Sequence, residues 1–218
     1  SEHHPDFVCL SFYKMFGFPT GLGALLVRRE AAEACLHKKY FSGGTVLAAR
    51  ADQDMHLLRQ DIAQRYEDGT VSFLGIMAVK DGLARLRTLN MAHVRLHTWS
   101  LRDYLASALL SMRHSNGAAV AELYGPRPGT GPDRAGSICA FNLKGPDGGY
   151  VRYSEVETLA ALEGINIRTG AFCNPGATQE HLGLSPGDLD LFLQHGKVCG
   201  DDNCVINGTP TGAIRVSF

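Results

Sequence analysis

Short apolar runs alternate with helical patterns along this chain, and that alternation limits the fold more than any other feature of the sequence. The runs over Phe7–Ser11 and residues 22–27 are bounded by Pro, Gly and Thr, which is typical of short buried strands. Apolar residues recur at helical spacing over 70–89, and strands and helices alternate again after residue 95. No apolar run approaches the length that spans a bilayer. We therefore expect a globular α/β or α+β protein.

Local start and stop signals place the remaining elements. Capping patterns predict helix starts at Ser100, Ser154 and Ser185. The expected helices cover 29–39, 54–66, 70–89, a segment from 100 onward, 154–164 and 185–196. The expected later strands cover 118–124, 137–143, 165–168 and 213–218. A domain boundary is expected between residues 93 and 94, so that the chain divides into 1–93 and 94–218.

Net charge and cysteine content limit which partners the chain can bind and which compartment it occupies. The formal net charge of the 218 residues is −1, so the chain has no basic footprint for nucleic acid or an anionic membrane surface. Its six cysteines are scattered rather than dense, which favours a reducing, cytoplasmic location over a secreted disulfide scaffold. The chain opens without methionine and closes inside an apolar strand. We therefore expect a fragment of a larger protein.

Lys14 is expected on a loop after the first strand, in an unusual setting for a lysine. Most lysines are solvated, so a plain surface residue is the first interpretation. Here Phe12, Tyr13 and Phe16 flank the amine and would partly desolvate it, which favours the neutral, nucleophilic form. That form is what an imine with an aldehyde such as pyridoxal phosphate (PLP) requires.

The run from Ser42 to Thr45, Ser-Gly-Gly-Thr, has the composition of an anion-binding loop. Its small residues bring backbone N–H groups and a hydroxyl together, as phosphate cradles do. A Gly-Gly pair is more often a plain turn. Beside an imine-forming lysine, Gly44 and Thr45 become candidates for binding the cofactor phosphate.

Cys173 lies on a Gly-flanked loop that should follow the short strand over 165–168. A free cysteine is more often an inert buried residue than a nucleophile. This thiol, however, follows Gly170 and precedes Asn-Pro-Gly, so it should be exposed and mobile. Arg168, five residues earlier, could favour the thiolate electrostatically. The pattern indicates a reactive thiolate.

Arg215 stands in the middle of the last apolar strand. An arginine there either reaches an edge and is solvated, or its planar fork binds a carboxylate bidentately. The residues alone leave these two interpretations equal.

Cys199 and Cys204, with His195 just upstream, offer the pattern nearest to a metal site. Their spacing does not match the tight Cys-x-x-Cys knuckle, and no second ligand pair accompanies them. We expect a polar loop here and no metal.

Taken together, these motifs resemble the class V aminotransferase superfamily of fold-type I PLP-dependent enzymes, and within it the cysteine desulfurases. Arg168-Thr-Gly-x-x-Cys173 resembles the desulfurase loop that carries the persulfide-forming cysteine, and Ser-Phe-Tyr-Lys14 resembles the PLP-lysine segment. The subgroup that sulfurates the molybdenum cofactor is the most similar. Its further motifs occur here in order, as Tyr40-Phe-Ser-Gly-Gly-Thr45, Glu67-Asp-Gly-Thr70, Arg113-His-x-Asn-Gly117, Phe172-Cys-Asn-Pro-Gly176 and Gly212-Ala-Ile-Arg-Val-Ser-Phe218.

The resemblance implies a fold and a set of residue roles. The expected fold is α/β, with 1–93 as the remainder of the PLP-binding large domain and 94–218 as the small α+β domain. Lys14 would hold PLP as an imine and act as the base at the substrate Cα. Gly44 and Thr45 would meet the phosphate, expected to be that of the other subunit of a homodimer. Arg215, with Arg168 beside it, would bind the carboxylate of L-cysteine.

The same resemblance implies a reaction. The Cys173 thiolate would attack the substrate sulfur, alanine would leave, and Cys173 would carry a persulfide. That sulfur would pass to the molybdenum cofactor, replacing an oxo by a sulfido ligand for xanthine dehydrogenase and aldehyde oxidase. Two departures accompany this expectation. The histidine that precedes the lysine in ordinary desulfurases is Tyr13 here, and the segment expected to hold the pyridine-nitrogen aspartate is not in the sequence, so we expect the fragment alone to bind PLP poorly.

Two alternatives stay open at this point. One is a general cysteine desulfurase that supplies sulfur to iron–sulfur clusters or tRNA. The other is an inactive scaffold in which the fold serves only dimerisation, although Lys14, Cys173 and Arg215 are all present.

Overall fold

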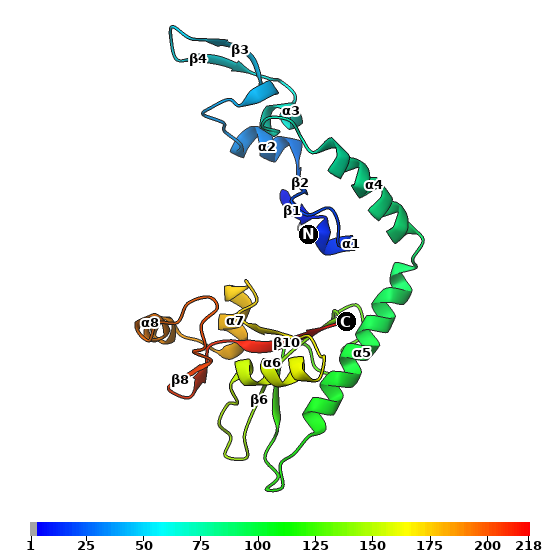
Figure 1. Ribbon diagram of the computed structural model, residues 1–218, viewed down its shortest axis with the longest axis vertical. Coiled ribbons are helices and arrows are strands. Elements are labelled where there is room, and N and C mark those ends of the chain that lie inside the picture. Colours follow the sequence, from blue (N-terminus) through cyan, green and yellow to red (C-terminus); the bar gives the residue numbers. More distant parts are fainter. Residues whose placement is uncertain (1–3) are drawn as a thin grey trace. The chain divides into compact units, whose positions relative to one another are not determined.

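The computed structural model describes residues 4–218, and the chain divides into two compact units, Ser1–Asn90 and Met91–Phe218. The division falls after residue 90, where the sequence predicted one after residue 93. In Figure 1 the first unit runs from blue to blue-green and the second from green to red. Each unit has its own sheets.

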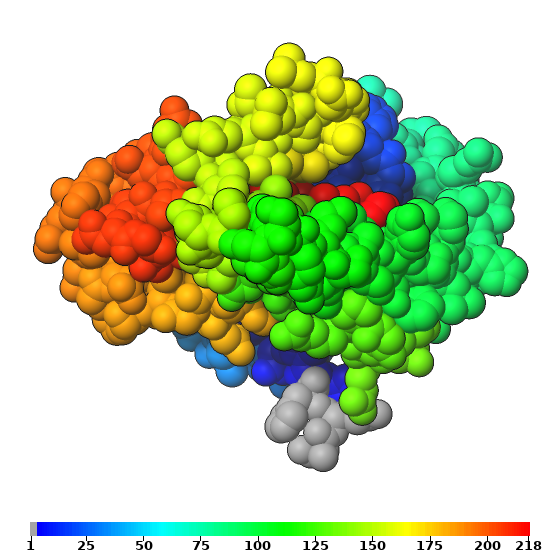
Figure 2. Space-filling view, turned by 90° about the horizontal axis from the view of Figure 1, so that it is seen from below, coloured from blue at the N-terminus to red at the C-terminus, as the bar shows by residue number. Residues whose placement is uncertain are grey.

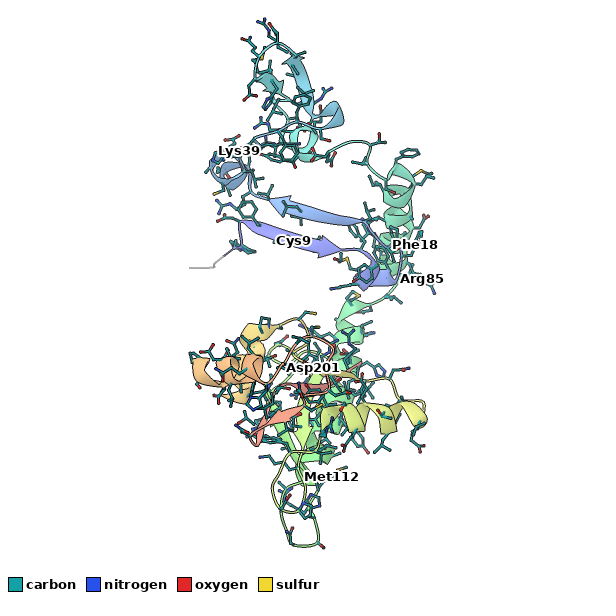
Figure 3. All side chains as sticks on the ribbon, turned by 60° about the vertical axis from the view of Figure 1, so that its left-hand side comes forward. Cys9, Phe18, Lys39, Arg85, Met112 and Asp201 are labelled. Atoms are coloured by element: carbon teal, nitrogen blue, oxygen red, sulfur yellow. The ribbon has the colours of Figure 1, made fainter. Side chains whose placement is uncertain are left out.

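The first unit consists of two antiparallel hairpins with short helices between and after them. Its elements are β1 (Phe7–Ser11), α1 (Tyr13–Phe16), β2 (Gly23–Val27), α2 (Arg29–Cys35), the 3₁₀ helix η1 (Gly43–Thr45), β3 (Val46–Arg50), β4 (Met55–Leu58), α3 (Ile62–Tyr66) and α4 (Phe73–Arg87). Strand β1 pairs with β2 in full register, with Cys9 opposite Leu25 in the middle of the hairpin (Figure 3). The connection between these strands contains α1, so the end of the hairpin carries Lys14.

The second unit is a four-stranded antiparallel sheet with helices. Its elements are α5 (Met91–Ser111), β5 (Ala121–Tyr124), β6 (Ile138–Leu143), α6 (Tyr153–Leu162), β7 (Arg168–Gly170), α7 (Pro175–Leu182), α8 (Pro186–Gln194), β8 (Val205–Ile206), β9 (Thr209–Pro210) and β10 (Ala213–Ser217). The strand order is β5-β6-β10-β7, so the last strand of the chain is an inner strand.

The core of the second unit lies on one face of this sheet. Helix α5 packs against β5 and β6, and α6 packs against β7 and β10. The core includes Ala106 and Leu109 from α5, Tyr153 from α6, and Phe141 and Ile214 from neighbouring strands. In the space-filling view the red of β10 shows only as a narrow band between green α5 and yellow α6 (Figure 2). Because side chains alternate along a strand, Arg215, next to buried Ile214, points to the opposite face.

One glycine allows a close approach that the site depends on. A Cβ added at Gly212 would lie 2.6 Å from the backbone of Gly170. Only a glycine lets the start of β10 pass this close to the end of β7. The strand that carries Arg215 is thereby held against the strand that leads into the cysteine loop.

The structure corrects the helix expected over 54–66. Residues Met55–Leu58 instead form β4, which pairs antiparallel with β3. The helix α3 begins only after Asp61, whose side chain accepts a hydrogen bond of 2.9 Å from the Gln64 N–H. The hairpin partner, β3, lies outside the sequence window that suggested a helix, so local periodicity did not reveal it.

Two of the three capping expectations are wrong and one is confirmed. Ser185 and Asp188 form a reciprocal capping box at the start of α8. Ser100 instead lies inside α5, which begins at Met91. At α6 the N-cap is Arg152 and makes no side-chain cap. There Glu157 accepts a 2.6 Å hydrogen bond from the Thr169 hydroxyl on β7, so a tertiary contact replaces the local one.

Two element boundaries and the element that carries Lys14 also differ. The helix expected over 29–39 ends at Cys35, and the strand expected over 165–168 is β7 at Arg168–Gly170. Lys14 lies on the one-turn helix α1 rather than on a loop.

Candidate active site

The cysteine loop is a strained turn between β7 and α7. Phe172 and Cys173 have φ values of 57° and 56°, in the left-handed region that non-glycine residues rarely occupy. Each such residue costs roughly 1–3 kcal/mol, so the surrounding structure must impose the conformation. The Asn174 N–H donates to Ala171 O at 2.9 Å, and the Asn174 side chain caps α7 by accepting from Ala177 N at 3.2 Å. The loop that was expected to be mobile is therefore tied at both ends.

The thiol of Cys173 is exposed on this turn, as the sequence predicted. All six cysteines of the chain are free, and Cys139 and Cys204 are the buried ones. Cys9, Cys35 and Cys199 are exposed too, so the left-handed turn rather than exposure sets Cys173 apart.

Arg215 lies on the inner strand β10, so the solvated-edge interpretation does not apply. Its guanidinium carbon is 5.2 Å from the centre of the Phe172 ring, a cation–π geometry. Its Nε is buried and has no hydrogen-bond partner among the described residues. A buried, unpaired donor on a guanidinium is costly unless an acceptor reaches it. The arrangement suits a carboxylate ligand.

A cavity of about 210 Å³ lies beside Arg215 on the face of the sheet opposite the core. Its walls come from β5, β6, β10, the cysteine loop and α7, with Tyr124, Phe172, Asn174, Thr178, His181 and Arg215 among the lining residues. The volume is several times the ~30 Å³ share of one water molecule, so a small organic molecule can enter. Phe172, next to Cys173, is part of the wall.

Arg168 stands directly opposite Arg215 in the β7–β10 register. Its side chain is exposed, and the described residues show no hydrogen bond or ion pair between it and Cys173. The two arginines nevertheless occupy paired positions on adjacent strands, and Arg215 lines the cavity.

Tyr124 is a cavity residue that the sequence analysis missed. Its hydroxyl accepts a 3.1 Å hydrogen bond from the fully buried Asn142 amide. Burial, reinforced by the charge of Glu122, raises the pKa of Tyr124 well above its usual value. The phenol therefore stays protonated, in the same cavity wall as Arg215. Its position in an apolar strand carries no sequence signal of this role.

In the first unit, Lys14 is exposed rather than desolvated, which corrects the expectation from its neighbours. Phe12 and Phe16 stack on each other with ring centres 6.3 Å apart, and Phe16 packs closely over Gly82 of α4. These rings occupy the other face of the α1 turn. The Lys14 amine is 5.9 Å from the centre of the Tyr13 ring. Within residues 4–218 it has no hydrogen-bond or ion-pair partner, so it is free to react.

The Gly-Gly-Thr segment folds as η1, with its threonine turned inward. Thr45 is fully buried, and its hydroxyl donates to Ser42 O at 2.9 Å and accepts from Ser42 N at 3.1 Å. Gly44 is exposed, and a Cβ added to it would meet nothing within 4 Å. An anion can therefore approach the backbone at Gly44, while the Thr45 hydroxyl shapes the turn.

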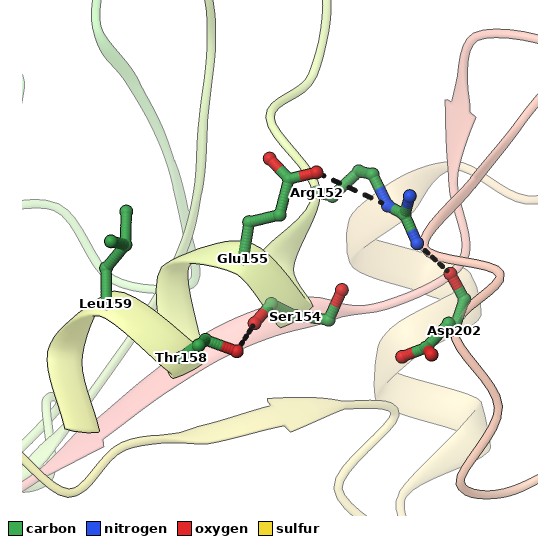
Figure 4. Close-up of a pocket in the computed structure, with 6 residues that line it drawn as sticks. All are labelled: Arg152, Ser154, Glu155, Thr158, Leu159 and Asp202. Carbon is green, nitrogen blue, oxygen red and sulfur yellow. Dashed lines mark hydrogen bonds and ion pairs between the residues drawn. The ribbon is translucent and has the colours of Figure 1, made fainter. Parts of the chain in front are cut away.

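A larger surface groove of about 470 Å³ lies at the start of α6 (Figure 4). Arg152 there pairs with Glu155 at 3.7 Å and donates to Asp202 O at 3.0 Å, and the Thr158 hydroxyl donates to Ser154 O at 2.9 Å (Figure 4). Arg152 and Thr158 thus find partners within the groove itself. None of the candidate catalytic or binding residues lines it.

Residues 4–218 contain neither a membrane-spanning helix nor a metal-binding cluster. No helix in this range combines the length and apolar character that membrane spanning needs. No cluster of three or more His, Cys, Asp or Glu side chains in this range could hold a metal ion.

Comparison with known proteins gives the family. The family Aminotransferase class-V matches residues 1–218, the whole chain. The chain belongs to the class V aminotransferase family. By structure it is similar to the cysteine desulfurase CsdA from Escherichia coli, with a TM-score of 0.64 and 22% sequence identity over 98% of this chain and 41% of that one. The expected α/β fold of the PLP-dependent transferases is confirmed.

Curated relatives are considerably more similar in sequence. The chain is 51% identical to a molybdenum cofactor sulfurase from Arabidopsis thaliana and 46% identical to one from Homo sapiens, in both cases over 100% of its own length. It spans 27% and 25% of the length of these two proteins. Within this class V family, the candidate residues stay predictions: Lys14, Gly44 and Thr45 in the first unit, and Arg168, Cys173 and Arg215 in the second.

Proposed function

We propose that this chain is part of a molybdenum cofactor sulfurase, which takes sulfur from L-cysteine as a persulfide on Cys173 and passes it to the molybdenum cofactor. The observation that carries the proposal is the second-unit site, where a strained turn exposes Cys173 and Phe172 lies against an arginine with an unpaired buried donor. The curated relatives named for that activity support it.

The residues of the first unit fit a PLP cofactor. The Lys14 amine is exposed and unpaired within residues 4–218, so an aldehyde can reach it, and the open backbone at Gly44 can take an anion. When bound, PLP supplies an electron sink that labilises the substrate Cα proton and the Cβ–S bond. Lys14 would hold the cofactor, then accept and return the proton at Cα. The phosphate would lie against Gly44 and Thr45 of the partner subunit in a homodimer.

The residues of the second unit would bind and cleave the substrate. Arg215 binds the L-cysteine carboxylate through its fork, and Phe172 holds the guanidinium in place. The Cys173 thiolate attacks the substrate sulfur, a new S–S bond forms and the Cβ–S bond breaks. L-cysteine and the Cys173 thiol thus become L-alanine and a Cys173 persulfide, with the sulfur oxidised and Cβ reduced. We place this chemistry in the cytoplasm, with xanthine dehydrogenase and aldehyde oxidase as clients of the sulfurated cofactor.

The acceptor test separates this proposal from a general desulfurase. The full-length protein that contains this chain is given L-cysteine labelled with radioactive sulfur and, in competition, molybdenum cofactor, an iron–sulfur scaffold protein and tRNA. We expect the label on the molybdenum cofactor, with recovery of activity in cofactor-dependent xanthine dehydrogenase. Label that goes instead to the scaffold or to tRNA would replace the proposal by the general desulfurase.

The carboxylate role of Arg215 predicts a split between KM and kcat. Arg215→Lys keeps the charge but loses the bidentate fork, and hydrogen bonds to charged groups are worth about 1.5–3 kcal/mol. We therefore expect the KM for L-cysteine to rise about ten- to hundredfold while kcat changes little. Arg134→Lys, at an exposed arginine of the same unit, is the matched control. A KM unchanged by Arg215→Lys would remove this residue from substrate binding.

A further inference from the structure

The Gly-Gly-Thr segment rests on a buried lysine that the proposed chemistry does not use. The side chain of Lys38 is only 3% exposed. Its ammonium donates to Thr45 Oγ1 at 3.4 Å, to Arg65 O at 3.0 Å and to the Asp68 carboxylate. An ammonium has three protons, so these three acceptors satisfy it completely. A buried charge is costly without such partners. The three acceptors therefore fix the position of the Lys38 ammonium.

The Glu67-Asp-Gly-Thr70 motif contacts both Lys38 and the Gly43–Thr45 turn. The Asp68 carboxylate accepts from Lys38 and, at 3.3 Å, from the Tyr40 hydroxyl. The next residue, Gly69, touches the turn directly, because a Cβ on Gly43 would lie 2.9 Å from the Gly69 Cα. Gly43 also has a φ of 54°, which glycine adopts without strain. The Glu67-Asp-Gly-Thr70 motif, which had no assigned role, thus packs against η1.

Positive charge gathers around the turn. Arg59 donates through Nε to Gly44 O, and Arg65 donates to Arg59 O at 2.7 Å and Gln60 O at 2.9 Å. Within residues 4–218 neither guanidinium forms an ion pair, because their partners are backbone carbonyls and the neutral Gln64 amide, and Asp68 pairs with Lys38. The single Thr45 hydroxyl proton is used on Ser42 O. An anion at Gly44 would therefore be attracted by the backbone N–H groups and by Arg59 and Arg65, rather than by the Thr45 hydroxyl.

We propose that Lys38, ion-paired with Asp68, is a positioning residue for the cofactor phosphate: this buried ion pair fixes the Gly43–Thr45 turn on which the phosphate would lie. The inference rests on the proposed PLP function and deepens it, because it assigns the phosphate preference of the site to a residue outside the glycine turn. Lys38 does not touch the phosphate itself; it acts through Thr45 and the turn.

Pyridoxal, which lacks the phosphate, tests this role without an activity assay. Binding of PLP and of pyridoxal to the full-length apoprotein is followed by the absorbance of the lysine-bound cofactor. Wild type is expected to prefer PLP strongly. In Lys38→Met the PLP affinity is expected to fall about ten- to hundredfold while pyridoxal affinity is unchanged. Lys38→Gln, which keeps an amide donor for the buried acceptors, is expected to lose the same preference, and Lys38→Arg, which keeps the charge, to retain most of it.

The control is the neighbouring Lys39→Met, since Lys39 is exposed on the segment after α2 (Figure 3). It should leave both affinities as in wild type. If Lys38→Met fails to fold, Lys38→Gln decides the question. A PLP preference that survives loss of the charge in the folded variant overturns the inference alone. Absorbance that persists in Lys14→Ala overturns the proposed function, and the inference with it.

Discussion

Lys14→Ala is expected to abolish both the absorbance of lysine-bound PLP and the release of sulfur from L-cysteine. The exposed, unpaired amine is the group that would hold the cofactor and move the proton at Cα. Losing a general base alone lowers rates about 10²–10⁴-fold, and here the covalent anchor is lost as well. The measurement is an absorbance spectrum and a sulfide assay on the full-length protein.

Two variants sharpen this experiment. Lys14→Arg keeps the positive charge but cannot form the imine, so it should fail as completely as the alanine variant. Lys80→Ala removes an exposed lysine from α4 in the same unit and should change nothing. Retention of both colour and activity in Lys14→Ala would end the assignment and favour the inactive scaffold.

Cys173→Ser is expected to separate substrate binding from sulfur transfer. Serine keeps the size and exposure of the side chain but cannot form a persulfide. PLP should stay bound and L-cysteine should still perturb its spectrum, because Lys14 and Arg215 are untouched. Persulfide labelling, followed by alkylation and mass spectrometry, should fall to background together with delivery of sulfur to the acceptor.

The matched control is Cys199→Ser. Cys199 is also exposed and lies in the same unit, but it is outside the strained turn. It should leave sulfur transfer at the wild-type rate. Undiminished persulfide formation in Cys173→Ser would exclude the nucleophilic role of Cys173.

Local signals predicted some elements well and others poorly. The Ser185–Asp188 box was found because both partners lie within one helical turn. The pattern at Ser100 failed because α5 continues through it, where its hydroxyl bonds to His97 O at 2.8 Å and Asp103 accepts from Gly129 N at 2.9 Å. A capping pattern specifies a possible start, but the length of the helix follows from what it packs against.

The site shows the same division between local and tertiary information. The lysine, the cysteine and the two arginines were singled out by residue type and spacing. Their surroundings were not, because Phe12 and Phe16 stack with each other instead of covering Lys14. Lys38 and Lys39 look alike in sequence, as an adjacent pair of solvated lysines. Only one of them is buried, and its partner Asp68 lies thirty residues away.

The sequence by itself determined the family motifs, the α/β character and the candidate nucleophiles, since these depend on residue type and short spacing. Only the tertiary structure decided that Arg215 lies on an inner strand under Phe172, and that Lys38 is buried beneath the glycine turn. Strand order, burial and ion pairing depend on contacts between segments that are distant in the chain. A local sequence pattern cannot predict them, because the stability of a strand pair or a buried ion pair depends on the neighbours that folding brings together.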